Sequence, residues 1–246
     1  MQIQEFKNFS IHLNQEIEMR IYGTQGKPVL AFPTRKGRYY DFENFGMLAA
    51  IEKWICAEKV ILITVDSIDD QSWANQNIPP VQRAQRHEAY DHYIIEEVVP
   101  FVHKQFDTNR QFVVLGCDMG AYHAANFFFR YPDVFDSMLS MSGWFQLQAF
   151  VGDYLDETVY FHSPLLYLPN LTDDWYLEKY RQSKIVICVG QGAWEEACLA
   201  NTRAMQRVLQ EKNIPALVDY WGLDVSHDWP WWRKQLPHFM DHLIAE

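Results

Sequence analysis

Short apolar runs alternate along this chain with segments of helical periodicity, and this alternation restricts the fold more than any other feature. The apolar runs lie at 29–32, 59–65, 112–115, 137–141 and 185–189. The segments of helical periodicity lie at 42–54, 84–105, 119–131, 194–212 and about 232–245. Continuous apolar runs bounded by turn residues are typical of parallel strands that are buried on both faces. The alternation therefore predicts a mostly parallel, doubly wound α/β sheet with helices on both faces.

The amino-terminal region has a different pattern. Residues 3–13 and 16–22 alternate apolar with polar side chains around Asn14-Gln15, which predicts an antiparallel hairpin at an edge of the sheet. The sequence has no internal repeat and no obvious linker, so we expect a single domain over residues 1–246. Residues 145–180 are aromatic-rich and irregular, and we expect a cap or lid there that shapes a pocket.

The charge of the chain restricts its partners. With 246 residues and a formal net charge of −11, it lacks the excess of Lys and Arg that binds nucleic acid or anionic membranes. The first eight residues contain no basic segment followed by an apolar run, and no apolar stretch approaches the length that spans a bilayer. We therefore expect a cytoplasmic protein whose partner is a small-molecule ligand or substrate.

The cysteines do not suggest a metal or disulfide framework. Cys56, Cys117, Cys188 and Cys198 form no CxxC pair, and two of them lie in apolar runs that are typical of buried strands. We expect all four to be reduced and buried, and we expect neither a metal nor a cofactor.

The most informative segment for chemistry is the apolar run at 112–115 followed by Gly116-Cys117-Asp118-Met119-Gly120 and then a helix. A strand, Gly-x-Asp-x-Gly and a helix in this order have the form of a nucleophile elbow, in which the central side chain stands above the sheet. An ordinary strand-to-helix turn is the alternative, but the position directly after an apolar strand favours the elbow. Asp118 is therefore the candidate nucleophile.

An acid and a base are expected later in the chain, in the order nucleophile, acid, base. Glu195, in the loop after the run at 185–189, is the first choice for the acid and Glu196 is the reserve. Both could instead be solvated residues in the first turn of the next helix. His227, in a polar loop before a helix that starts with Pro230, is the candidate base. Five other histidines are interpreted as helix-surface residues: His87, His92, His103, His238 and His242.

An oxyanion hole at such an elbow uses the backbone N–H after the nucleophile, here that of Met119, and a second N–H from the loop after the third strand. That loop is 33–38, which contains Arg35 and Lys36. These cations could form a solvated turn, or they could contact Asp118 or an acidic ligand at the mouth of the site.

Several long strings resemble the esterase D-like branch of the α/β hydrolases, the putative esterase family, and especially its small bacterial members. They lie at 31–34, 42–47, 65–69, 72–73, 83–90, 96–101, 116–129 and 226–232, and the resemblance covers nearly the whole chain. It implies the α/β-hydrolase fold, ester hydrolysis, a catalytic triad at Asp118, Glu195 and His227, and possible homodimers. Members typically have Gly-x-Ser-x-Gly-Gly at the elbow and a glycine-rich oxyanion loop, where this chain has Asp118, Ala121, Arg35 and Lys36.

Two functional hypotheses follow from Asp118. The first is an esterase-like hydrolase of a small ester with an atypical carboxylate, although carboxylate attack on a carbonyl would give a high-energy mixed anhydride. A carboxylate attacks saturated carbon more readily, as in haloalkane dehalogenases and epoxide hydrolases. The second is a catalytically impaired homologue in which Asp118 pairs with protonated His227 and a small ligand still binds. Asp118 could also be an introduced substitution, but the departures at Ala121, Arg35 and Lys36 favour natural divergence.

Overall fold

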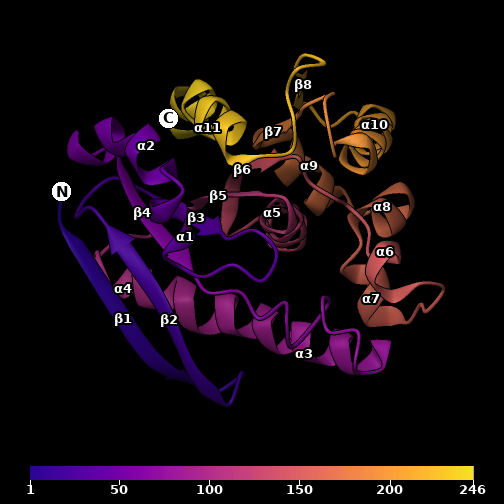
Figure 1. Cartoon of the computed structure of the whole chain (residues 1–246), viewed down its shortest axis with the longest axis horizontal. Coiled ribbons are helices and arrows are strands. Elements are labelled where there is room, and N and C mark those ends of the chain that lie inside the picture. Colours follow the sequence, from indigo (N-terminus) through magenta and orange to yellow (C-terminus); the bar gives the residue numbers. More distant parts are fainter. Residues whose placement is uncertain (246) are drawn as a thin grey trace.

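The chain is built around one twisted sheet of eight strands. The structure, a computed structural model, describes residues 1–245 (Figure 1). The strands follow the spatial order β1-β2-β4-β3-β5-β6-β7-β8; β1 and β2 pair antiparallel, β2 pairs antiparallel with β4, and the remaining neighbours are parallel. Their bounds are β1 (Ile3–Ser10), β2 (Gln15–Tyr22), β3 (Lys27–Phe32), β4 (Val60–Val65), β5 (Phe112–Cys117), β6 (Phe135–Met141), β7 (Lys184–Val189) and β8 (Leu217–Tyr220). The predicted α/β sheet with an antiparallel hairpin at one edge is confirmed.

Helices cover both faces of the sheet. Their bounds are α1 (Asp41–Asn44), α2 (Met47–Cys56), α3 (Pro80–His92), η1 (Tyr93–Val98), α4 (Val99–Gln105), α5 (Met119–Arg130), α6 (Gln148–Val151), α7 (Glu157–Phe161), α8 (Pro164–Tyr167), η2 (Leu168–Asn170), α9 (Asp174–Gln182), α10 (Glu196–Glu211) and α11 (Trp229–Ile244). Helices α2 and α11 pack together on one face, whereas α3, α4 and α5 lie on the other (Figure 1). None of the helices in residues 1–245 is long and apolar enough to cross a membrane.

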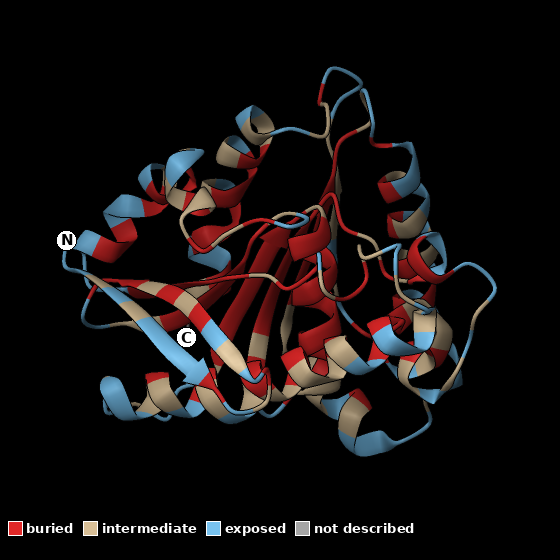
Figure 2. Ribbon diagram, turned by 60° about the horizontal axis from the view of Figure 1, so that its bottom comes forward, coloured by how far each residue is buried: buried red, intermediate tan, exposed pale blue. Residues whose placement is uncertain are grey.

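The alternation of side chains along each central strand produces two apolar layers. In β4, Ile61 and Ile63 face the layer under α3 to α5, whereas Val60 and Leu62 face the layer under α2 and α11. Figure 2 shows these strands as buried along their length, because helices cover them on both sides. The continuous apolar runs of the sequence are explained by this double burial.

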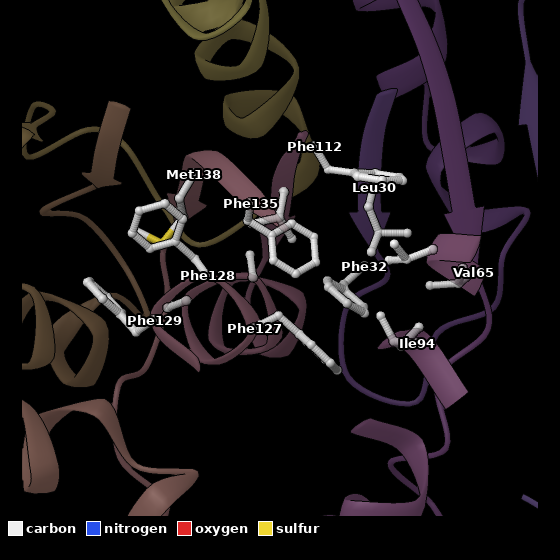
Figure 3. Packing of buried hydrophobic residues seen from close by; sticks show 14 of the residues in the cluster. Leu30, Phe32, Val65, Ile94, Phe112, Phe127, Phe128, Phe129, Phe135 and Met138 are labelled. Carbon is white, nitrogen blue, oxygen red and sulfur yellow. The ribbon is translucent and has the colours of Figure 1, made fainter. Parts of the chain in front are cut away.

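The first layer is dominated by aromatic rings from α5. Phe127, Phe128 and Phe129 are almost fully buried, and Phe127 stacks on Phe32 of β3 with ring centroids 5.0 Å apart (Figure 3). Three consecutive phenylalanines point in three directions around a helix, so α5 must be enclosed on nearly all sides. This enclosure fixes the helix that starts directly after Asp118.

Two predicted helices differ from the observed ones. The segment expected at 42–54 is divided into α1 and α2 at Gly46, whose φ of +80° is a left-handed conformation that interrupts the helix. The segment expected at 84–105 begins earlier, at Pro80, and passes through the π-helical turn η1 before α4. Pro100 in the first turn of α4 cannot donate a backbone hydrogen bond, which is consistent with a widened turn before it.

Two burial predictions were wrong. His87 is fully buried, because it lies on the same face of α3 as the buried Ala84 and Tyr90, against the ring of Trp73. Cys56 is exposed, because it is the last residue of α2, whereas the other three cysteines are buried; all four are free thiols.

The expected strand at 3–13 ends at Ser10, where the Ser10 hydroxyl donates to Glu97 and accepts the N–H of Leu13.

Residues 145–180 contain the short helices α6 to α8 and most of α9. Helices α6, α7 and α8 lie at the side of the molecule away from the hairpin (Figure 1). Phe150 of α6 faces Arg35, which places one end of this segment beside the loop after β3. Its role as a cap stays a prediction.

Truncating one methylene in the sheet tests the double burial of β4. We expect Ile63→Val to lower the free energy of unfolding by about 0.5–1.5 kcal/mol, because Ile63 is fully buried and a cavity remains. Ile11→Val is the matched control; its side chain is 82% exposed in the hairpin turn, and we expect a change within about 0.5 kcal/mol. Urea unfolding of both variants measures the difference, and equal values would contradict the burial of β4.

Candidate active site

Asp118 lies at a sharp turn between β5 and α5. Its φ of 54° and ψ of −122° are strained for a residue with a side chain, and they lift the carboxylate above the carboxyl ends of the strands. The flanking glycines allow this geometry: a Cβ on Gly116 would lie 2.2 Å from the carbonyl carbon of Gly120. A Cβ on Gly120 would lie 2.5 Å from the carbonyl oxygen of Phe32, so α5 packs directly against the end of β3. The predicted elbow geometry is present.

His227 lies between two carboxylates. Its Nε2 is 3.4 Å from Asp118 Oδ1, and its Nδ1 is 3.2 Å from Glu195 Oε2. The backbone N–H of His227 donates to the carbonyl of Ala193 at 3.0 Å, which ties the histidine loop to the loop after β7. The ring also meets Trp232 edge to face, with centroids 5.0 Å apart. The structure therefore brings the three predicted residues into one row.

Glu195 is the carboxylate that reaches the histidine. It is 1% exposed, and its Oε1 accepts hydrogen bonds from the Ser142 hydroxyl at 2.6 Å and the Gly190 N–H at 3.3 Å. Glu196, the reserve choice, is an exposed residue in the first turn of α10. A buried carboxylate fixed by two donors can orient the imidazole, whereas an exposed one at a helix N-terminus mainly favours the helix dipole.

The loop after β3 directs one backbone N–H toward Asp118. Arg35 N donates to Asp118 Oδ2 at 3.1 Å, and the backbone N–H of Met119 also helps to lower the pKa of this carboxylate. Lys36 N instead donates to Asp69 Oδ2 at 3.1 Å. The Arg35 guanidinium is 3.9 Å from Asp118 Oδ1 and lies over the rings of Trp144 and Phe150.

A buried pair behind this loop was not found from the sequence. Asp69 and His123 are both 1% exposed, and His123 Nε2 lies 2.9 Å from Asp69 Oδ1. Asp69 therefore joins the loop, through Lys36, to helix α5, through His123. This connection holds the N–H groups of Arg35 and Met119 in a fixed relation. The sequence signal was His123, five residues after Asp118 on the same helix, but no pattern pointed to its partner.

The charges of the site stabilise one another. Burial opposes the positive charge of His227, but hydrogen bonds to Asp118, Cys198 and Glu195 outweigh it and raise its pKa to about 11. Burial opposes the negative charge of Asp118, yet hydrogen bonds from His227 and from the backbone N–H of Arg35 lower its pKa. At neutral pH the site therefore contains an Asp118 carboxylate paired with a His227 imidazolium.

A pocket of about 420 Å³ opens beside this pair, within the size range of small-molecule sites. Four tryptophans line it: Trp144, Trp194, Trp229 and Trp232. Trp194 is 76% exposed and has a left-handed backbone, so its indole stands at the rim instead of in the core. The lining is thus rich in aromatic rings, and it also includes the charged side chains of Asp118, His227 and Arg35.

Two clusters in residues 1–245 bring metal-ligating groups together. His12, His92 and Glu96 meet at the surface between the hairpin turn and the end of α3. Glu195, Cys198 and His227 meet inside the candidate active site. No spacing motif in the sequence had suggested either cluster.

The parallel sheet, the elbow after β5 and the acid and histidine loops after β7 and β8 define an α/β hydrolase. A family model described as "Putative esterase" matches residues 12–243, nearly the whole chain. The chain belongs to this esterase family, as the resemblance of its sequence implied. A search of curated proteins found no match.

Solved structures with this fold include several esterases. A ferulic acid esterase has a TM-score of 0.78 at 13% identity, with 99% of this chain and 97% of that chain covered. The S-formylglutathione hydrolase FrmB from Staphylococcus aureus has a TM-score of 0.75 at 15% identity, with both chains fully covered. MPT51 (FbpC1) from Mycobacterium tuberculosis has a TM-score of 0.76 at 12% identity, with 100% of this chain and 98% of that chain covered. At these identities the likeness shows the fold.

Proposed function

We propose that this protein is an esterase homologue that binds a small molecule in the pocket beside Asp118, and that Asp118 blocks ester hydrolysis. The observation that carries the proposal is the hydrogen bond from Arg35 N–H to Asp118 Oδ2 at 3.1 Å. The backbone N–H of Met119 also helps to lower the pKa of this carboxylate. In an esterase, two such N–H groups stabilise the negative oxygen that forms during attack on the ester. Here the protein's own carboxylate accepts the Arg35 N–H and carries its negative charge beside Met119, so an ester oxygen would have to compete with it for these donors.

The state of His227 supports the same proposal. A general base must accept a proton, but the pKa of His227 is raised to about 11, against its burial, by hydrogen bonds to Asp118, Cys198 and Glu195. The imidazolium at neutral pH cannot activate a nucleophile. Carboxylate attack on a carbonyl would also produce a mixed anhydride, which is higher in energy than the ester. Asp118 and His227 thus form a stable ion pair, and Glu195 holds the other ring nitrogen of His227.

The pocket itself supports binding. Its aromatic wall can bury apolar or ring-shaped groups, and the guanidinium of Arg35, 44% exposed, can contact a polar substituent. As part of the proposal we place the protein in the cytoplasm, in agreement with four free cysteines, and we assign it a small-molecule partner and no nucleic acid.

Hydrolysis of 4-nitrophenyl acetate by the unmodified protein tests the proposal. We expect a rate equal to that of His227→Ala, because the imidazolium contributes no base catalysis. In a thermal-shift screen of small esters, acids and amides, we expect compounds that stabilise the protein, by about 2.7 kcal/mol at 100 times their Kd. These compounds should stabilise Trp194→Ala less, because Trp194 lies at the rim of the pocket.

Two outcomes would reject this function. Turnover by the unmodified protein that is lost in His227→Ala would make Asp118 a working catalytic residue. Incubation with alkyl halides or epoxides that adds the alkyl group to Asp118, seen by peptide mass spectrometry, would instead indicate attack on saturated carbon.

A further inference from the structure

Two side chains of different chemistry converge on the Nδ1 side of His227. Glu195 Oε2 lies 3.2 Å from Nδ1, and Cys198 Sγ lies 3.8 Å from it. The three possible ligand atoms all lie within 4.8 Å of one another. Glu195 and Cys198 are each 1% exposed, so this is a buried group and not a chance meeting of surface residues.

These separations match the edges of a zinc coordination tetrahedron. With Zn–N and Zn–O near 2.0–2.1 Å and Zn–S near 2.3 Å, neighbouring ligands stand about 3.4 Å (N to O) and about 3.6 Å (N to S) apart. The observed 3.2 Å and 3.8 Å differ from these values by only a few tenths of an ångström. A cation would therefore fit with small side-chain shifts.

Asp118 gives His227 the tautomer that ligation needs. An ionised carboxylate only accepts hydrogen bonds, so Nε2, which faces Asp118, carries a proton. In the neutral imidazole the lone pair then lies on Nδ1, toward Glu195 and Cys198. A carboxylate on the far nitrogen of a ligating histidine is a common feature of zinc sites, where it orients the ring and strengthens the ligand.

The other two ligands also have outer partners. Trp144 Nε1–H donates to Cys198 Sγ at 2.8 Å, which would stabilise a thiolate. The Ser142 hydroxyl donates to Glu195 Oε1 at 2.6 Å and leaves Oε2 directed at His227. Each of the three ligands is thus held by a second residue, as in a prepared metal site.

We propose that Glu195, Cys198 and His227 form a site for a thiophilic divalent cation of the zinc type. Cys198 and His227 both line the pocket, so the fourth coordination position faces its interior. Binding displaces the thiol proton of Cys198 and the Nδ1 proton of His227. One dication replaces two protons, and the total charge of the buried group is unchanged. This goes beyond ligand binding at Asp118 and reverses the expectation of no metal, because the ligands come from two distant loops that share no spacing motif.

Titration of the metal-free protein with Co²⁺ tests the site. A cobalt–thiolate bond gives a near-ultraviolet charge-transfer band, and we expect this band at one equivalent, removed by competition with Zn²⁺. We expect it to be lost in Cys198→Ser. Two matched controls should keep it: Cys56→Ser, which removes the exposed cysteine, and His12→Ala/His92→Ala, which removes the surface cluster. Asp118→Asn should keep the band but weaken binding about 10–100-fold.

X-ray absorption of the zinc-loaded unmodified protein provides a measurement that does not depend on the folding of any variant. We expect one Zn–S distance near 2.3 Å together with N/O ligands near 2.0–2.1 Å. A zinc shell without sulfur would overturn the proposal. So would a cobalt band that survives in Cys198→Ser, or one that disappears in Cys56→Ser or in His12→Ala/His92→Ala.

Discussion

Replacing Asp118 with serine is expected to raise kcat/KM for 4-nitrophenyl acetate at least about 10²-fold over the unmodified protein. The substitution removes the carboxylate oxygen that accepts the N–H of Arg35, so this donor becomes available to the ester oxygen, and it removes the negative charge beside the N–H of Met119. It also removes the negative partner of His227, so the imidazole can be neutral and accept the serine proton. Glu195 remains in place to hold Nδ1–H.

Two further substitutions at this site separate the causes of the gain. Asp118→Asn keeps the shape of the side chain but supplies no alcohol, so we expect no gain in turnover. Asp118→Ser/His227→Ala keeps the free N–H groups and loses the base, so its activity should fall by about 10²–10⁴ relative to Asp118→Ser.

The neighbouring glutamates provide a matched pair in the Asp118→Ser background. Glu195→Gln should lower kcat/KM by about 10² or more, because the buried carboxylate orients and stabilises the imidazolium. Glu196→Gln removes an exposed carboxylate one residue away and should leave the rate unchanged. Equal activity of Asp118→Ser and the unmodified protein, with thermal unfolding unaltered, would contradict the view that Asp118 blocks this site.

The sequence was sufficient to predict the layers of the fold. The run Val60–Val65 is apolar at every position except Thr64, which is typical of a strand that is buried on both faces of a parallel sheet. The break between α1 and α2 could not be predicted from the sequence. Gly46 ends one helix and starts the next with a φ of +80°, but the same glycine inside an apolar-periodic segment is equally compatible with an uninterrupted helix. The break depends on tertiary packing and not on local pattern.

The sequence pointed to Asp118, Glu195 and His227 but not to the buried pair behind them, Asp69 and His123. Asp118, Glu195 and His227 each follow a strand, and parallel strands place their carboxyl ends at one edge of the sheet, so loop position alone brought them together. Asp69 and His123 contact each other across 54 positions of sequence, and their pairing depends on how α5 rests on the loop after β3. Single-residue patterns carry no information on such a contact. The catalytic roles of Asp118, Glu195 and His227 stay predictions.

Cys198 could not be predicted as a site residue for the same reason, because its contact with His227 depends on tertiary packing. It lies three residues after Glu195 at the start of α10, and the sequence showed it only as a cysteine without a partner. Its contact with His227 Nδ1, at 3.8 Å, requires the loops after β7 and β8 to meet. The hydrogen bond between Gly192 N and the Val225 carbonyl, at 2.8 Å, joins those loops. A ligand set assembled by such a contact has no sequence signature.

The titration of His227 is expected to differ greatly between the unmodified protein and Asp118→Ser. Hydrogen bonds to Asp118, Cys198 and Glu195 outweigh burial and raise the pKa of His227 to about 11, so the ring stays protonated at neutral pH. In the NMR spectrum its ring protons should therefore not titrate between about pH 5 and 9. Without the carboxylate of Asp118, the pKa should fall toward the ordinary histidine value of about 6.5.

The direction of this shift determines the pH profile of Asp118→Ser. A base must be neutral, so ester hydrolysis should rise with pH as His227 loses its proton and should level off above its pKa. The midpoint of the rate profile should coincide with the NMR midpoint of the same variant, since both report one proton on one ring. A midpoint near 6.5 in the unmodified protein would mean that Asp118 and His227 form no ion pair. The blocked state of the site would then need a different cause, because a neutral His227 is free to act as a base.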